Sequence, residues 1–204
     1  MSRIVVLLLC LIPGFVLAQT YPALYDVTDV ADNDVLNLRA APDAKAEIIG
    51  ALDPAGPAIE VILTSPDESW GMVNVDERTG WAAMRHLVRQ TGQDGDGFPK
   101  PLVCFGTEPF WNAFVAVGEK LQFNVLGETP LALSDHRRVR VAGRSDKYAE
   151  IWGSDTTSIV AVVTRAACND GMSDRAFGFS ADFVVAPLVG GGIAYSGCCS
   201  LSQD

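Results

Sequence analysis

The side chains best suited to chemistry or ligand binding lie in the second half of the chain. Glu108 precedes a proline and two aromatic residues, and Asp170 and Asp174 flank Met172. If these two stretches lie side by side, three carboxylates and the ring of Trp111 share one face. Such a face could bind a cationic or sugar-containing ligand, because carboxylates attract cations and aromatic rings stack on sugars. In the structural alternative, the polar groups cap a turn and the apolar groups fill the end of a barrel.

Motifs of the common hydrolases are absent from the sequence. No Gly-x-Ser-x-Gly elbow occurs, and the stretch Tyr195-Ser196-Gly197-Cys198 lacks the histidine that a thiol nucleophile requires. The only histidine after Cys104 is His136. Two carboxylates could form a glycosidase pair, but nothing in the sequence marks a cleft for them. We therefore predict that the protein is not an enzyme.

Residues 1–18 have the features of a secretory signal peptide. Arg3 supplies the positive charge, residues 4–11 form an apolar run, and Ala18 ends a stretch of small and apolar residues suited to cleavage. The run is too short to span a bilayer, and no later segment reaches eighteen apolar residues. We expect a periplasmic or secreted protein with no transmembrane segment after signal cleavage.

The formal net charge of −10 argues against nucleic acid as a partner, because phosphate binding requires clustered Lys and Arg. The most basic stretch, residues 136–140, alternates like a solvent-exposed strand edge.

Four cysteines follow the signal peptide, and in an exported chain an even number predicts disulfides. A bond between the neighbours Cys198 and Cys199 would need a strained ring. We therefore expect Cys104 and Cys168 each to pair with one of the terminal two, in either combination. The alternative, a zinc site of four thiolates, is disfavoured because zinc ligands usually come in pairs two to four residues apart. We expect no metal and no cofactor.

Short strand-like runs separated by turn residues fill the first half of the chain and predict a small all-β barrel or sandwich. Alternation is clearest in one run, where Gly71, Val73 and Val75 lie on one face and Trp70 and Met72 on the other.

This half also carries an ordered set of motifs. An Asn-Leu-Arg-Ala-Ala-Pro opening at 37–42 precedes an isoleucine-glycine turn, a strand starting at Trp70 and a glycine before Trp81. On these motifs residues 19–90 resemble a bacterial SH3 domain. The resemblance implies a small β-barrel that is not catalytic and that targets peptidoglycan or peptides. Trp70 is the preferred ligand contact because it lies opposite the valines, whereas Trp81 is either a contact or partly buried core.

Residues 91–101 are rich in glycine, proline and polar residues and are predicted to be a linker. Residues 102–204 are again predicted to be β-strands, forming a disulfide-tied β-barrel or β-sandwich of unknown function. The motifs Gly-Thr-Glu-Pro-Phe-Trp at 106–111 and Cys-Asn-Asp-Gly-Met-Ser-Asp at 168–174, with Gly-Cys-Cys at 197–199, resemble a family of exported bacterial domains that has no assigned activity.

Together these features predict an exported, non-catalytic binding protein of the bacterial envelope, with peptidoglycan or a periplasmic protein or peptide as partner. The alternative is a cell-wall hydrolase, or a regulator or inhibitor of one. The candidate ligand-binding residues are Trp70, Trp81, Glu108, Trp111, Asp170, Met172 and Asp174.

Overall fold

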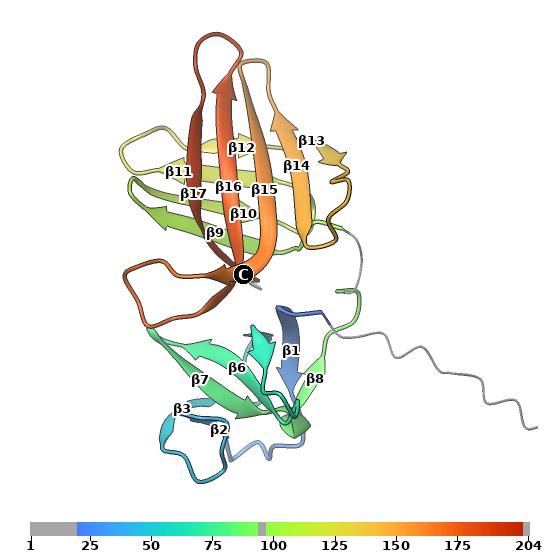
Figure 1. Cartoon of the computed structure of the whole chain (residues 1–204), viewed down its shortest axis with the longest axis vertical. Helices are drawn as coiled ribbons and strands as arrows, with labels where there is room; N and C mark the ends of the chain where they lie inside the picture. The colour runs from blue at the N-terminus through green and yellow to red at the C-terminus, as the bar shows by residue number, and fades with distance from the viewer. Residues whose placement is uncertain (1–19, 94–96, 202–204) are drawn as a thin grey trace, which may run out of the picture.

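The computed structural model of the protein describes residues 20–93 and 97–201 (Figure 1). Apart from one 3-10 turn, η1 (Met84–His86), the regular structure of these residues is β-strand, so the predicted all-β class is confirmed. Within this part of the chain, no helix has the length and apolar character needed to cross a membrane. The predicted signal peptide and part of the predicted linker, residues 94–96, lie outside the described residues.

The first half consists of two small antiparallel sheets that pack around one core (Figure 1). One sheet has the order β4 (Ile59–Val61), β1 (Ala23–Val27), β8 (Leu87–Arg89). The other has the order β3 (Ile48–Leu52), β2 (Leu36–Arg39), β7 (Arg78–Ala83), β6 (Trp70–Val75), β5 (Leu63–Thr64).

Side-chain alternation explains how these strands meet their core. In β6, Gly71 and Val73 are buried, whereas Trp70 and Met72 on the opposite face are partly exposed, as the sequence predicts. A Cβ atom at Gly71 would lie 2.7 Å from Met84 Sδ and 2.9 Å from Val61 Cγ1, so a larger residue would require core side chains to shift where β6 passes over the core.

The second half is a single nine-stranded antiparallel sheet that curls into a nearly closed barrel (Figure 1). Its edge strands β12 and β13 follow one another in the chain with only Ser134 between them, which brings the two edges of the sheet together. The sequence left a barrel and a sandwich open, and the structure is the barrel. Its order is β12 (Leu131–Leu133), β11 (Leu121–Val125), β10 (Phe110–Val115), β9 (Leu102–Thr107), β17 (Ile193–Leu201), β16 (Phe177–Pro187), β15 (Thr157–Cys168), β14 (Lys147–Gly153), β13 (Asp135–Val139).

Aromatic side chains fill the barrel. Trp111, Phe123 and Phe183 pack with ring centroids 5.3–5.7 Å apart, and Trp152 is fully buried. Full burial of one such apolar side chain contributes about 1.5–3 kcal/mol, so this cluster accounts for much of the stability of the barrel. The core of the first half is a separate cluster, which gives the chain two hydrophobic centres.

The segment between β15 and β16 joins the two halves (Figure 1). Asn74 on β6 binds Ala176 twice, donating to its carbonyl at 2.7 Å and accepting from its N–H at 3.1 Å. The Thr79 hydroxyl on β7 donates to the Asp174 carbonyl at 3.0 Å. Asn74 and Thr79 thus bind the backbone of this segment with their side chains and attach it to the sheet of the first half.

A second contact between the halves surrounds Glu60 on β4. Its carboxylate accepts the backbone N–H of Leu201 at 2.9 Å. Nearby, the Arg165 guanidinium donates to the Pro22 carbonyl at 3.1 Å, and Gly178 approaches Pro22 so closely that a Cβ atom there would clash with the proline ring. Burial raises the pKa of Glu60 from 4.5 to about 8, although the Leu201 N–H and the charges of Arg175 and Arg165 act in the opposite direction.

This raised pKa predicts how the stability of the junction depends on pH. The folded protein binds the Glu60 proton more tightly than the unfolded chain, so this group's contribution is largest below pH 4.5 and is lost as pH rises toward 8. Urea unfolding at pH 5 and pH 8.5 should therefore show a smaller pH-dependent loss of stability in Glu60→Gln than in the wild type. Identical losses in the two proteins would contradict this assignment.

Candidate ligand-binding cleft

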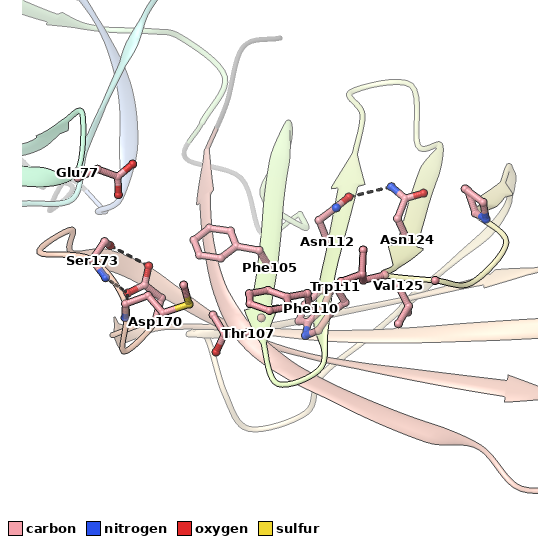
Figure 2. Close-up of a pocket in the computed structure, with 15 residues that line it drawn as sticks. Glu77, Phe105, Thr107, Phe110, Trp111, Asn112, Asn124, Val125, Asp170 and Ser173 are labelled. Carbon is pink, nitrogen blue, oxygen red and sulfur yellow. Dashed lines mark hydrogen bonds between the residues drawn. The ribbon is translucent and has the colours of Figure 1, made fainter.

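A cavity of about 650 Å³ opens where the β9–β10 turn faces the segment between β15 and β16. Its volume falls within the range of small-molecule sites, roughly 300–1,000 Å³. Figure 2 shows Glu77 and the turn carrying Asp170 and Ser173 on one side, and Phe105, Phe110 and Trp111 on the other. We call this cavity the cleft. Its lining residues are Glu77, Phe105, Gly106, Thr107, Phe110, Trp111, Asn112, Asn124, Val125, Leu126, Gly127, Pro130, Asp170, Met172 and Ser173.

Trp111 forms the inner wall of the cleft. It is only 4% exposed, its ring packs against Phe123 and Phe183, and its indole N–H donates to the Ser196 carbonyl at 3.4 Å. The exposed apolar surface comes instead from Phe110, which is 53% exposed, and Met172, which is 68% exposed. A ligand in the cleft would therefore meet Phe110 and Met172 before it reached the Trp111 ring.

Asp170 shapes the turn that carries Met172. One carboxylate oxygen accepts the backbone N–H groups of Met172 and Ser173, both at 3.0 Å, and the other accepts the Ser173 hydroxyl at 2.8 Å. Burial alone would raise the pKa of Asp170, but these hydrogen bonds and the charge of Arg175 lower it below its ordinary value. Asp170 is therefore an ionised turn cap, and its charge remains on the wall of the cleft.

The cleft combines negative charge with amide groups. Glu77 and Asp170 line it, and no Lys, Arg or His belongs to its described lining. On the adjacent strands β10 and β11, the side-chain amide of Asn124 donates to the side-chain carbonyl of Asn112 at 2.8 Å. The side-chain N–H groups of Asn112 and the side-chain carbonyl of Asn124 have no side-chain partner among the described residues. The cleft can thus offer an apolar contact, two hydrogen-bonding amides and a negative potential.

The other two predicted carboxylates lie outside the cleft. Glu108 is exposed and lines a neighbouring cavity of about 420 Å³, which Asp170 and Asp182 also line. Asp174 is exposed, and its backbone contacts the first half, where its N–H donates to the Glu77 carbonyl at 3.1 Å. The expected trio of carboxylates around an aromatic ring is therefore divided among the cleft, the second cavity and the junction.

In the first half, Trp70 and Trp81 lie on the same outward face of the sheet, and both are partly exposed. Trp70 lines a cavity of about 260 Å³ together with Asp34, Arg39 and His86. Trp81 lies opposite Arg39 in the ladder and does not belong to that lining. Arg39 braces the following loop by donating to the Ala46 carbonyl at 2.7 Å.

Comparison with known proteins tests the resemblance of the first half. Residues 34–88 match the family model described as the bacterial SH3 domain. This part of the chain is a bacterial SH3 domain. No curated protein and no solved structure matches the chain, and nothing in these comparisons identifies the barrel that follows the SH3 domain.

The four cysteines form two disulfides, Cys104–Cys199 and Cys168–Cys198. The structure thereby settles the pairing that the sequence left open. The first bond joins adjacent strands β9 and β17, and the second ties the end of β15 to β17 just before the Asp170 turn. Two disulfides indicate an oxidising location outside the cytoplasm. Among the described residues, no group of three or more His, Cys, Asp or Glu side chains is placed to hold a metal ion.

Sequence reasoning missed two parts of the cleft. A signal for the amide pair was present, because a hairpin centred on the Gly118-Glu119 turn places Asn112 opposite Asn124. The sequence carries no pattern that places Glu77 in the cleft, because Glu77 approaches the Asp170 turn only through the packing of the two halves.

The Cys168–Cys198 bond is expected to fix the cleft wall that Met172 occupies. Replacing both cysteines with serine should lower the free energy of unfolding by about 2–4 kcal/mol and increase amide exchange across residues 169–176. Urea unfolding and hydrogen exchange measure these effects, and the Cys104→Ser/Cys199→Ser variant is the matched control. Unchanged exchange in 169–176 would contradict this role.

Proposed function

We propose that the protein is an exported, non-catalytic binding protein of the bacterial envelope. Its SH3 domain docks on cell-wall material, as bacterial SH3 domains commonly do, and its cleft binds an apolar ligand that carries positive charge. The observation that carries this proposal is the composition of the cleft. Exposed Phe110 and Met172 lie beside the carboxylates of Asp170 and Glu77, with no cationic side chain in the described lining.

The chemistry of the cleft supports a periplasmic peptide or protein segment as its ligand. An apolar side chain can cover Phe110 and Met172, a Lys or Arg can approach Glu77, and a peptide backbone can bond to Asn112 and Asn124. Because the ligand would displace water from exposed apolar surface and meet a negative potential, its affinity should combine both effects.

Docking on the cell wall is expected to depend on Trp70. Peptidoglycan carries carboxylates, so an acidic protein must bind it through specific contacts. Stacking of an aromatic ring contributes about 0.5–1.5 kcal/mol, and Trp70→Ala should therefore weaken co-sedimentation of the mature protein with purified sacculi by roughly 2- to 10-fold.

Leu63→Ala is the control for this experiment, because Leu63 is also exposed on the same sheet but lies outside the Trp70 cavity. Equal binding by the wild type and Trp70→Ala would remove Trp70 from the contact. Failure of the wild type to sediment at any salt concentration would overturn wall docking and leave a soluble periplasmic protein or peptide as the partner.

A cell-wall hydrolase is the second candidate function, since Glu108 and Asp170 line one cavity. A glycosidase pair needs one carboxyl group that stays protonated and one that is free to act. Asp170 does not fit the first role because its pKa is lowered, nor the second because both of its oxygens accept hydrogen bonds within the turn. The same features suit a regulator or inhibitor of a hydrolase, which needs no catalytic group.

The non-catalytic proposal predicts that the mature protein releases no soluble muropeptides from purified sacculi. Chromatography of the supernatant after prolonged incubation measures this, with a known wall hydrolase as positive control. Release by the wild type that disappears in Glu108→Gln would show catalysis and would overturn this part of the proposal.

A further inference from the structure

A strongly basic segment lies on the barrel away from the cleft. Between residues 137 and 147 the chain carries four arginines and one lysine, against a single acidic residue, Asp146. The whole chain has a formal net charge of −10 and only 15 Lys and Arg residues. A third of its cations are therefore concentrated in β13, the start of β14 and the loop between them.

These cations surround a cavity of about 640 Å³, which we call the basic cavity. Arg138, Arg140, Arg144 and Lys147 line it, and the buried ring of Tyr148 forms part of its wall. It shares no lining residue with the cleft.

Each acidic group near the basic cavity is already engaged. Glu119 lies 3.1 Å from Arg138, and Asp146 accepts from the Arg144 guanidinium at 2.7 Å. The hydrogen bond from Arg138, with the charges of His136 and Lys100, holds the pKa of Glu119 below its ordinary value, which keeps that carboxylate ionised. Glu150 is the one carboxylate in the cavity lining, and it is buried.

Glu150 projects from β14 toward the barrel interior, where only 1% of its side chain is exposed. Lys100, from the predicted linker, approaches its carboxylate to 3.0 Å, and His136 of β13 approaches it to 3.1 Å. A buried carboxylate needs such partners, because removing it from water without compensation is costly. Glu150 is therefore already paired with Lys100.

Two cations of the basic cavity form no ion pair in the described part of the chain, although the charge of Asp146, which pairs with Arg144, also acts on Lys147. Arg140 and Lys147 form no ion pair with any residue in 20–93 or 97–201. Both line the cavity, together with the two paired arginines, whose guanidinium groups still have further N–H donors. The basic cavity thus combines two cations that form no ion pair with planar donors that suit oxyanions.

We propose that the basic cavity binds a phosphate group. A phosphate monoester carries about −1.5 to −2 charges at neutral pH, which matches the two cations that form no ion pair, whereas a carboxylate carries one. Guanidinium groups bind phosphate oxygens in bidentate fashion, and three arginines line the cavity. Its volume also leaves room for the group to which the phosphate is attached. The phosphate can belong to a soluble sugar phosphate or to a lipid headgroup.

Binding is tested on the mature protein by isothermal titration with inorganic phosphate and glucose 6-phosphate. A flotation assay compares vesicles that contain phosphatidic acid, whose headgroup is a phosphate monoester, with vesicles of phosphatidylcholine. The test variant is Arg140→Glu/Lys147→Glu, and Arg140→Gln/Lys147→Gln serves as a milder form. The control is Arg137→Glu, since Arg137 lies on the same basic strand but outside the cavity lining.

We expect saturable binding by the wild type, at least tenfold weaker binding by both cavity variants and little change in the control. Binding of the soluble phosphates alone identifies a soluble ligand, and selective flotation with phosphatidic acid identifies a lipid headgroup. No binding in either assay overturns the proposal. An equal loss of affinity in Arg137→Glu also overturns it, because that result would mean that only the general charge of the strand attracts anions.

Discussion

The segment from Cys168 to Ala176 is fixed at both ends, and the arrangement of the molecule depends on this double attachment. At one end the Cys168–Cys198 disulfide ties it to the barrel, and at the other Asn74 binds Ala176 through two hydrogen bonds. Between these points Asp170 closes a turn with its own carboxylate. The cleft wall and the junction between the halves are therefore one structural feature, and loosening either end would change both.

This arrangement places contrasting surfaces on different parts of the protein. The cleft beside the fixed segment is apolar and negatively charged, whereas the basic cavity around β13 is lined by Arg138, Arg140, Arg144 and Lys147. The SH3 domain adds a third surface at Trp70. The proposed roles of these three surfaces are docking on cell-wall material, binding of an apolar cationic ligand and binding of a phosphate group.

Local pattern was enough to predict much of the fold. Alternation around Val73 and the ordered motifs of the first half led to the correct SH3 domain, and the even number of cysteines led to two disulfides. The candidate site was harder to predict because it depends on tertiary packing. Trp111 lies in the barrel core because β10 turns it toward Phe123 and Phe183, and nothing in its flanking sequence separates that position from an exposed one. Asp174 faces the first half for the same reason.

The central claim is that the two halves form one unit through the fixed segment rather than two domains joined only by a linker. It is tested most directly by inserting a specific protease site between Gly92 and Gly97, cleaving the mature protein and measuring its elution by size exclusion under native, oxidising conditions. We expect a single peak at the position of the intact protein, with both fragments present in it. Elution of the two fragments as separate peaks would contradict the account.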